Sequence, residues 1–561
     1  MDNSQIKSRK RISDHGEVFT AEREVKAMCD MVGDACGRIS SRILEPACGD
    51  GNFLAEILRR KLRTVSDSFS GIPEEWTKRA MEAISSLYGV ELLPDNAEEC
   101  RKRLLAIWSD SYAVEFGYKP DSGLMDAVEF ILHENILCGD ALTLLDSNGV
   151  PLAFPFWQMS DDGTVARKDF ELATLLEMQR NGGQGDLFLS SGAFDRETGA
   201  FLPNPIREYE TVPYMSVSTA KAYDVEPSWC RDDDVSSALR FDVVIGNPPY
   251  QKDDGGAQSS ATPLYHLFVR NAILLMPAML AMIIPSRWFA GGKGLDGFRE
   301  EMIHDDRLCV IHDFPDASEC FPDVEIKGGV NYFLWKRDHH GPCRIHTHRK
   351  GVAVSEMERP LVEPGCVSFI RCNEAVSILR KVRAHNETPF SSKVNSAMFF
   401  GLRTFFRDFD SDQPKDGTVL LYANQTQGYV RKERILRNAE CIDRWKVIVP
   451  EATGTGNSMR DRLKPILSAP GSANTETYVM NGPWKDRNEA ENVIAYIGTR
   501  FFHFLLGLMK ITQHTTSRTY SLIPMQDFSR RWTDAELFSK YGLTDEEIRF
   551  IEESVWPEAK A

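Results

Sequence analysis

The chain of 561 residues is long enough for two to four domains with large cores, and its 42% hydrophobic and 26% charged residues are typical of globular proteins. Twelve cysteines without any Cys-x-x-Cys argue against a disulfide framework and against a zinc ribbon. The sequence shows neither an apolar stretch long enough to span a membrane nor a signal peptide, so we expect a cytoplasmic protein without membrane contact.

The net charge of −16 is unevenly distributed along the chain. Between Ser391 and Arg531 there are 20 Lys and Arg against 14 Asp and Glu, so this region is positive and the acidic excess lies elsewhere. Because a polyanion is attracted to local positive charge, the C-terminal part is the part suited to bind nucleic acid.

The first motif is Gly16-Glu-Val-Phe-Thr20, which precedes a helix expected to begin near Glu22. Val25, Met28 and Val32 follow at helical spacing. Thr20 is a good N-cap residue, and from the residues alone a cap is the simpler interpretation of this motif.

A glycine-rich turn follows the first predicted strand, within the stretch from Arg42 to Leu54. Gly49 and Gly51 allow the backbone to approach a ligand closely at the carboxyl end of that strand, where open α/β sheets bind their ligands. No Gly-x-x-x-x-Gly-Lys-Ser/Thr follows, and Glu45 and Asp50 would repel phosphate, so a zwitterionic or cationic ligand fits better than a nucleoside triphosphate.

Two further predicted strands, Leu87–Leu92 and Ile136–Leu142, carry Glu91 and Asp140 near their ends and are separated by helical segments. This alternation predicts a doubly wound, mostly parallel, Rossmann-like α/β sheet. Glu91 suits ribose hydroxyls and Asp140 an exocyclic amine, although either acid could simply cap a helix.

The stretch Phe241–Tyr250 predicts a buried strand that ends at Gly246 and continues into a rigid Asn-Pro-Pro-Tyr corner. The Asn247 carboxamide oxygen and the Pro248 carbonyl are two acceptors that together fit an –NH2 group, and the Tyr250 ring fits a planar base or amide. The alternative is an ordinary proline-rich turn.

In this order, Gly16–Thr20, Leu44-Glu-Pro-Ala-Cys-Gly-Asp-Gly-Asn-Phe53, Glu91, Gly139-Asp140 and Asn247-Pro-Pro-Tyr250 resemble the S-adenosylmethionine-dependent N6-adenine DNA methyltransferases of bacterial restriction–modification systems. The cofactor motif precedes the catalytic one, as in the gamma group of that family. The resemblance covers roughly residues 11 to 350. The residue after Thr20 is alanine, where the family usually has proline.

The resemblance implies a flipped adenine as substrate, S-adenosylmethionine as cofactor and no metal. The catalytic residues that it implies are Asn247, Pro248, Pro249 and Tyr250. The cofactor-binding residues that it implies are Thr20, Glu45, Ala47, Gly49, Gly51, Glu91 and Asp140.

We expect a methyltransferase domain over residues 1–350, interrupted by an insertion at about 146–239 that is long for a connection between strands. Within it, Arg167–Arg180 is expected to be a helix. A target-recognition, DNA-binding domain of mixed α+β structure is expected over 365–540. A C-terminal helix should occupy 541–561, opened by a capping box at Thr544-Asp-Glu-Glu547.

Two other patterns invite different functions. Pro315-Asp316 with Glu325-Ile-Lys327 matches the loose pattern of a metal-dependent nuclease, but the methyltransferase sheet needs this region for its last strands, so we expect no cleavage. The histidines between His339 and His348 could form a metal cluster. Instead, Gly341-Pro342 predicts a hairpin turn that places His346 and His348 on one exposed face.

Short β-like runs and a long helix over Glu489–Lys510 are expected in the C-terminal domain. Its arginine and lysine side chains are suited to contact phosphates and base edges. The predicted DNA-binding residues are Arg431, Lys432, Arg434, Arg460, Arg462 and Arg518.

The sequence therefore predicts a site-specific methyltransferase for adenine N6 in double-stranded DNA. A protein glutamine methyltransferase is an alternative, because a side-chain amide also presents a planar –NH2 group. A catalytically inactive DNA-recognition subunit is another. A separate restriction endonuclease would be a compatible partner.

Overall fold

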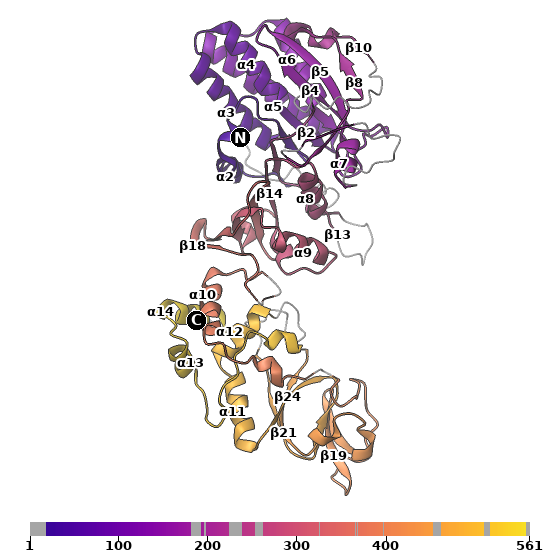
Figure 1. Ribbon diagram of the computed structural model, residues 1–561, viewed down its shortest axis with the longest axis vertical. Coiled ribbons are helices and arrows are strands. Elements are labelled where there is room, and N and C mark those ends of the chain that lie inside the picture. Colours follow the sequence, from indigo (N-terminus) through magenta and orange to yellow (C-terminus); the bar gives the residue numbers. More distant parts are fainter. Residues whose placement is uncertain are drawn as a thin grey trace. The chain divides into compact units, whose positions relative to one another are not determined.

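The computed structural model divides the chain into two compact units, Met1–Pro360 and Leu361–Ala561, and each is described here by itself (Figure 1). The residues described are 18–180, 192–195, 198–223, 238–252, 262–324, 326–364, 366, 369–395, 398–452, 462–509 and 516–556.

The first unit is built on a nine-stranded sheet in the order β18-β17-β15-β16-β14-β11-β1-β2-β3. The strands from β14 to β3 are mutually parallel, and β16 runs antiparallel to both of its neighbours. This confirms the predicted mostly parallel, doubly wound sheet. The bounds are β1 Ile43–Glu45, β2 Leu87–Glu91, β3 Ile136–Cys138, β11 Val243–Gly246, β14 Met279–Pro285, β15 Leu308–Phe314, β16 Val330–Lys336, β17 Cys343–Arg349 and β18 Val352–Arg359.

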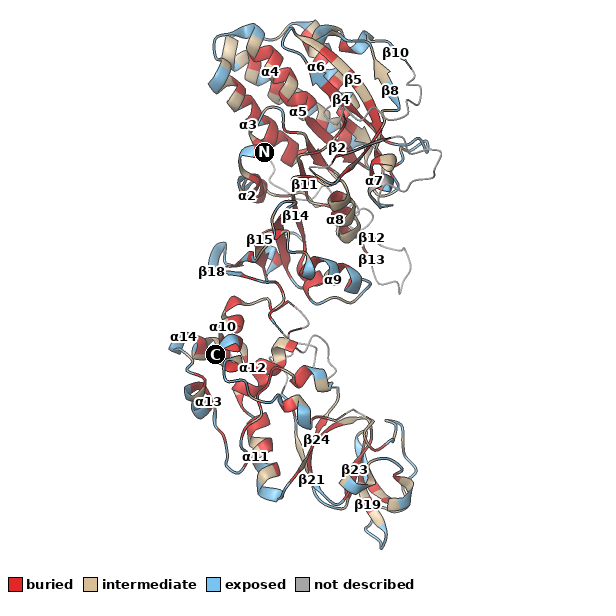
Figure 2. Ribbon diagram, viewed as in Figure 1, coloured by how far each residue is buried: buried red, intermediate tan, exposed pale blue. Residues whose placement is uncertain are grey.

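Helices α2 to α6 share one hydrophobic core with the parallel strands. In α3, the residues Phe53, Ile57, Leu58 and Leu62 recur at helical spacing and are buried, because this stripe packs on the sheet and on its neighbouring helices (Figure 2). The helices of the unit are α2 Glu22–Val32, α3 Asn52–Phe69, α4 Pro73–Ser85, α5 Pro94–Phe116, α6 Ser122–Asn135, α7 Leu172–Arg180, α8 Tyr265–Leu274 and α9 Asp296–His304.

The insertion folds into an antiparallel sheet that packs against the parent fold. The Tyr88 hydroxyl donates to the Pro155 carbonyl at 3.0 Å, and Trp157 Nε1 donates to Asn135 Oδ1 at 2.7 Å. Its sheet contains β4 Ala153–Met159, β5 Thr164–Glu171, β8 Arg207–Tyr209, β9 Val212–Pro213 and β10 Ala222–Tyr223, and β6 Gly192–Phe194 pairs separately with β7 Phe201–Pro203. Outside the insertion, β12 Gln251–Lys252 pairs with β13 Thr262–Pro263.

The helix predicted over Arg167–Arg180 is wrong in its first part, since Thr164–Glu171 is a strand and the helix begins at Leu172. Val165, Arg167 and Asp169 alternate inward, and the last two are buried as an ion pair with Nε and Oδ1 2.7 Å apart. Because two of the inward residues are charged, the sequence here lacks the alternation of apolar and polar residues that predicts a strand.

The histidine segment also differs from its prediction. Gly341-Pro342 connects β16 to β17, which are not paired with each other; β17 instead pairs with β15 and forms its hairpin with β18. His346 and His348 do share a face, but both are only partly exposed. Among the described residues, no group of three or more His, Cys, Asp or Glu is arranged to hold a metal ion.

The second unit combines two three-stranded sheets with five helices among its described residues, which agrees with the predicted mixed α+β structure. Its strands are β19 Thr418–Ala423, β20 Thr426–Arg431, β21 Trp445–Pro450, β22 Ile466–Ser468, β23 Ser472–Asn474 and β24 Tyr478–Trp484. Its helices are α10 Asn373–Arg383, α11 Arg487–Ile497, α12 Arg500–Met509, α13 Asp534–Lys540 and α14 Asp545–Ser554.

The single long helix predicted over Glu489–Lys510 is two helices, α11 and α12, bent by 67°. The Asp534 carboxylate accepts from the backbone N–H groups of Arg500 and Phe501, and this cap from a distant segment starts a new helix. The capping box at Thr544 and Glu547 is present as predicted. Within the described ranges, no single helix has the length and apolarity to cross a membrane, although α11 and α12 meet those criteria as a bent pair.

Candidate active site

A cavity of about 500 Å³ lies where the carboxyl ends of β1, β2, β3 and β11 meet. Its walls come from loops that follow all four strands, so residues far apart in the sequence share one space. Of the predicted cofactor residues and catalytic residues, those that line it are Thr20, Glu45, Ala47, Gly49, Glu91, Asp140, Asn247 and Pro249.

The glycine-rich turn after β1 forms part of the wall of this cavity. Gly49 and Gly51 have φ of +52° and +82°, a region that residues with a Cβ rarely adopt. A Cβ on Gly51 would also lie 2.6 Å from Cys100 Sγ of α5. Gly51 does not line the cavity but is the N-cap of α3, so its role is to let the turn lie closely against α5.

Glu45 ends β1 and is 2% exposed, with Oε2 lacking any hydrogen-bond partner among the described residues. Burial raises the pKa of this carboxyl well above its usual range. An ideal Cβ on Gly246 would lie 3.2 Å from Glu45 Cγ, so a glycine at the end of β11 leaves room for the acid. The unpaired Oε2 beside the cavity is suited to accept from a cationic or hydrogen-donating ligand.

Glu91 is held by the protein on both carboxylate oxygens. Its Oε2 accepts from the Gly49 N–H at 2.8 Å, and its Oε1 accepts from the Leu93 N–H at 3.0 Å. Oε1 also accepts from Asn96 Nδ2 at 3.3 Å. Glu91 therefore links β2 to the glycine-rich turn and to the start of α5. Asp140 Oδ1 accepts from the Leu142 N–H at 2.8 Å and from the Thr143 N–H at 3.4 Å.

The Asn247 carboxamide has a defined orientation. Its Nδ2 donates to the Val18 carbonyl at 3.0 Å, while its buried Oδ1 has no partner in the part of the chain described. Thr20 is buried in the same N-terminal segment and lines the cavity; the cap of α2 is Ala21, so the capping interpretation of Thr20 is wrong.

Tyr250 has a buried hydroxyl and a partly exposed ring. Phe321 packs edge-on against that ring, with centroids 6.0 Å apart and planes at 83°. Sequence analysis missed both Phe321 and Val18. Phe321 lies in Cys-Phe-Pro between two strands, where no sequence motif indicates that it would contact Tyr250. Val18 contributes a backbone carbonyl, which any residue type could provide.

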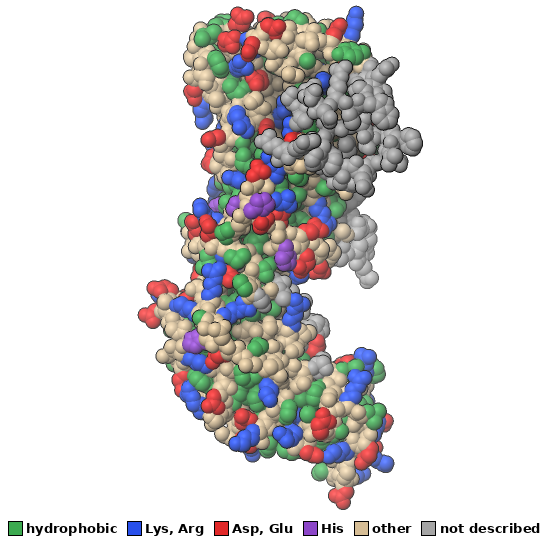
Figure 3. Space-filling view, in the orientation of Figure 1, with side chains coloured by type: hydrophobic (Ala, Val, Ile, Leu, Met, Phe, Trp, Pro, Cys, Tyr) green, Lys and Arg blue, Asp and Glu red, His purple; other side chains and the backbone are tan. Residues whose placement is uncertain are grey.

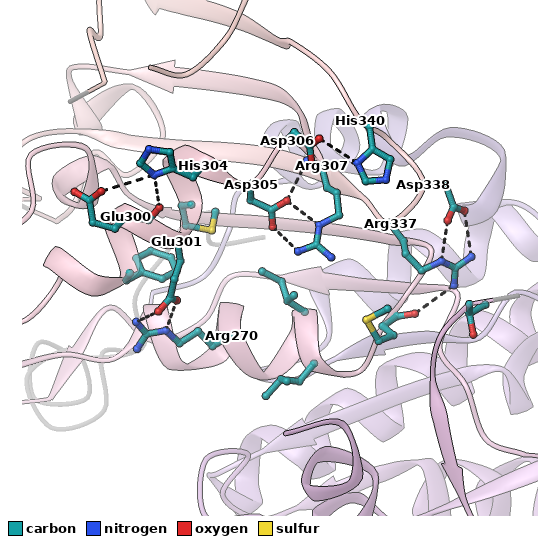
Figure 4. Close-up of a pocket in the computed structure, with 16 residues that line it drawn as sticks. Arg270, Glu300, Glu301, His304, Asp305, Asp306, Arg307, Arg337, Asp338 and His340 are labelled. Carbon is teal, nitrogen blue, oxygen red and sulfur yellow. Dashed lines mark hydrogen bonds and ion pairs between the residues drawn. The ribbon is translucent and has the colours of Figure 1, made fainter. Parts of the chain in front are cut away.

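A second, larger depression of about 910 Å³ lies at the opposite edge of the sheet, where β14 and β15 begin. Its charged residues are paired with one another (Figure 4). Arg270 binds Glu301 through two hydrogen bonds, and Arg307 binds Asp305 in the same way. The charged side chains of this depression therefore bind one another. Among the described strands, those that run parallel begin here, and their carboxyl ends lie at the other edge of the sheet.

The nuclease pattern is not assembled as a site among the residues described. Asp316 caps a short helical turn by accepting from the Ser318 N–H at 3.0 Å. Glu325 lies outside the described residues. The strands on either side, β15 and β16, belong to the central sheet, as expected.

The predicted DNA-binding residues are dispersed over the second unit. Arg431 ends β20, and Lys432 and Arg434 lie in the short helical turn after it. Each pairs with an acid of the same unit: Arg431 with Asp410 at 3.8 Å, Lys432 with Asp443 at 2.5 Å, and Arg434 with Asp408 at 2.6 Å. On the face drawn in Figure 3, basic side chains are interspersed with acidic ones.

The remaining predicted residues lie in other parts of the unit. Arg462 stacks over Trp556, with Cζ 4.3 Å from the ring centroid, and Arg518 is exposed in a short helical turn. Arg460 lies outside the described residues. Of the five predicted residues that the structure describes, Arg431, Lys432 and Arg434 lie together, and Arg462 and Arg518 lie in other segments.

The mostly parallel sheet, with a glycine-rich turn after its first strand and a cavity at the carboxyl ends of its strands, is a Rossmann-like α/β fold. Residues 176–321 match the family model described as Eco57I restriction-modification methylase. An uncharacterized adenine-specific methylase of Mycoplasma pneumoniae is 38% identical over 112 residues, which are 19% of this chain and 26% of that protein. Residues 176–321 are thus similar to an Eco57I restriction-modification methylase, and a stretch of 112 residues is similar to an adenine-specific methylase.

The chain spans only about a quarter of the length of this curated relative. Solved structures with similarity include the type IIL restriction-modification enzyme MmeI in complex with DNA, at 10% identity and a TM-score of 0.38 over 92% of this chain and 69% of that one. A modification subunit of a putative type I restriction enzyme from Vibrio vulnificus is 13% identical, with a TM-score of 0.31 over 61% and 49% of the two chains.

Proposed function

We propose that this protein is an S-adenosylmethionine-dependent methyltransferase for adenine N6 in double-stranded DNA, of the gamma group. The observation that carries the proposal is that one cavity joins the acids at the strand ends to Asn247, whose Oδ1 has no partner among the described residues. A cofactor bound to Glu45, Glu91 and Asp140 would then lie next to Asn247 Oδ1, which can accept a hydrogen bond from an amino group.

The cavity residues fit this cofactor. Glu45, Glu91 and Asp140 complement a positively charged ligand that also carries ribose hydroxyls and an amino group. Leu92 and Leu93 offer apolar surface for a purine ring. When bound, S-adenosylmethionine supplies an electrophilic methyl group.

The catalytic corner positions the target amine by hydrogen bonds. In our proposal the Asn247 Oδ1 and the Pro248 carbonyl accept the two hydrogens of the adenine amino group, and this directs the nitrogen lone pair away from the ring. The Tyr250 ring stacks on the base. The adenine must leave the duplex, because its amino group cannot reach such a corner while it is stacked. The gain in rate comes from positioning, without a conventional general base.

DNA recognition is assigned to the second unit, whose positive surplus is suited to phosphates. The match to a restriction-modification methylase family supports a role in DNA modification, with a separate endonuclease as a compatible partner. Chromosomal DNA as substrate implies the cytoplasm.

The test is transfer of a radiolabelled methyl group from S-adenosylmethionine to duplex DNA, followed by digestion to nucleosides. We expect label in N6-methyladenine, and none with Asn247→Ala. This variant loses the proposed substrate acceptor and the hydrogen bond to Val18 but keeps Glu45, Glu91 and Asp140, so it should still bind the cofactor. Loss of a preorganised contact of this kind costs about 10²–10³ in rate. Label in a glutamine-containing peptide but not in DNA would favour the protein-methylating alternative, and wild-type turnover by Asn247→Ala would refute the catalytic assignment.

A further inference from the structure

Phe405, in the second unit, is 79% exposed. It belongs to the segment 399–410, whose other phenylalanines turn inward. Phe400 is buried in a core with residues of β19 and β20, and Phe399, Phe406 and Phe409 pack against that core. A single large aromatic ring held in water within such a segment needs a reason, because burying a ring is favourable.

The backbone on both sides of Phe405 is anchored. The Thr404 N–H donates to Glu476 Oε1 at 3.1 Å, and the Arg407 guanidinium donates to the carbonyls of Phe406 and Asn424 at 2.9 and 3.1 Å. The backbone that carries the ring is therefore already held in place, so little backbone conformational entropy would be lost when the ring contacts a partner.

A second segment, 431–438, lies beside the first. Asn438 Nδ2 donates to the Phe399 carbonyl at 2.7 Å, and Arg434 Nη1 donates to the Asp408 carbonyl at 2.7 Å. This neighbouring segment carries Leu436, which is 88% exposed. Together the two segments form one surface, here called the Phe405 surface, that carries two exposed apolar side chains.

The charge of the Phe405 surface indicates its partner. The two segments contain six Arg and Lys against three Asp and Glu. Arg431, Lys432 and Arg434 are paired with acids of the same unit, so the positive charge left for a partner comes from the other three arginines. The Arg403 side chain is 61% exposed, and it pairs with Glu476 at 3.4 Å. The Arg437 side chain lies over Gly401 and has no acidic partner among the residues described. An aromatic ring between arginines is suited to a polyanion that offers flat apolar faces, which is the chemistry of stacked bases between phosphates.

We propose that Phe405 inserts against the bases of duplex DNA, with Arg403 and Arg437 on the neighbouring phosphates. This inference rests on the proposed function and adds a contact that would help to open or bend the duplex near the target. A wedge of this kind would act on stacking, and so it would contribute to affinity for DNA without contributing to the salt dependence, which comes from the arginines.

The experiment compares DNA affinity of the full chain, by fluorescence anisotropy at several salt concentrations, for Phe405→Ala, Phe405→Trp and Arg437→Gln. We expect about tenfold weaker binding for Phe405→Ala with an unchanged salt slope, the magnitude typical of base–aromatic stacking, and near wild-type binding for Phe405→Trp. Arg437→Gln should instead lower the salt slope by about one phosphate. Val114→Ala, which alters a side chain on α5 that is 86% exposed, is the matched control and should leave binding unchanged.

Wild-type affinity in Phe405→Ala would overturn the proposal and would leave this ring as a contact for a protein. A wild-type chain that binds no DNA would overturn the proposed function itself, so the two failures are distinguishable. Equal melting temperatures of the variants would show that the fold is unaffected, as the exposure of Phe405 predicts.

Discussion

At the scale of single residues, the catalytic corner depends on a contact between segments 229 residues apart, in which the Val18 carbonyl accepts from Asn247 Nδ2. An asparagine carboxamide presents an acceptor on one side and a donor on the other. Because the donor is bound to Val18, the acceptor is the atom that our proposal assigns to the substrate. The N-terminal segment thus orients the Asn247 carboxamide as well as lining the cavity.

Glu91 offers a residue-scale test of the cofactor site. Glu91→Ala removes the acceptor of the Gly49 N–H and a ligand for a hydroxyl, so we expect weaker binding of S-adenosylmethionine by about 1.5–3 kcal/mol, the usual value for a hydrogen bond to a charged group. Calorimetric titration measures it, and Glu98→Ala, on the surface of α5, is the control. An unchanged dissociation constant for Glu91→Ala would show that the cofactor lies elsewhere.

The residues predicted from the sequence were those whose role is visible in a local pattern. Glu45, Glu91 and Asp140 follow predicted strands, and parallel strands bring their carboxyl ends to one edge of a sheet. Phe321 and Val18 could not be predicted in this way, because their contacts arise only when the strands β11 and β16 and the N-terminal segment are assembled.

At the scale of elements, the predicted secondary structure is wrong where a buried ion pair or a helix cap from a distant segment outweighs the local hydrophobic pattern. Strand β5 was missed because its inward positions include a buried ion pair, and the helix over Glu489–Lys510 was predicted as one because the cap from Asp534 lies outside it. The central strands were predicted well, since buried parallel strands are nearly continuous apolar runs.

Lys61 of α3 provides an element-scale prediction. It is fully buried, its Nζ donates to the carbonyls of Ile39 and Ser41 before β1, and burial lowers its pKa to about 7. In the unfolded chain the pKa is near 10.5, so between these values the unfolded state binds more protons and stability rises with pH, by up to about 1.4 kcal/mol per pH unit.

Urea unfolding at pH 7, 8 and 9 measures this slope, and Lys61→Met, which keeps the length of the side chain, should flatten it. The contribution is lost as the pH falls toward 7, because the folded state then holds a charge that is costly to bury. An identical slope in both proteins would mean that Lys61 is charged in the fold throughout this range.

At the scale of the whole molecule, the two units divide chemistry from recognition in our proposal. Arg431, Lys432 and Arg434 were predicted from their positive charge alone, yet each is paired with an acid of the same unit. A count of charges along the sequence cannot show such pairing, because the partners come from other segments.

Exchange of residues 361–561 for the corresponding unit of a related enzyme tests this division. The chimera should methylate a different DNA sequence while still modifying adenine N6, because the chemistry lies in the first unit. Sequencing of the modified DNA reads both properties. An active chimera that retains the original site would place recognition in the first unit, with the insertion at about 146–239 as the leading candidate.

The central claim is that this chain methylates adenine N6 at specific DNA sites through Asn247. Long-read sequencing of DNA from methylation-deficient bacteria that express the wild-type chain or Asn247→Ala tests it most directly. We predict N6-methyladenine at one recurring sequence with the wild-type chain and none with the variant, at equal amounts of folded protein. Unmodified DNA with the folded wild-type chain, or equal modification with Asn247→Ala, would contradict the account.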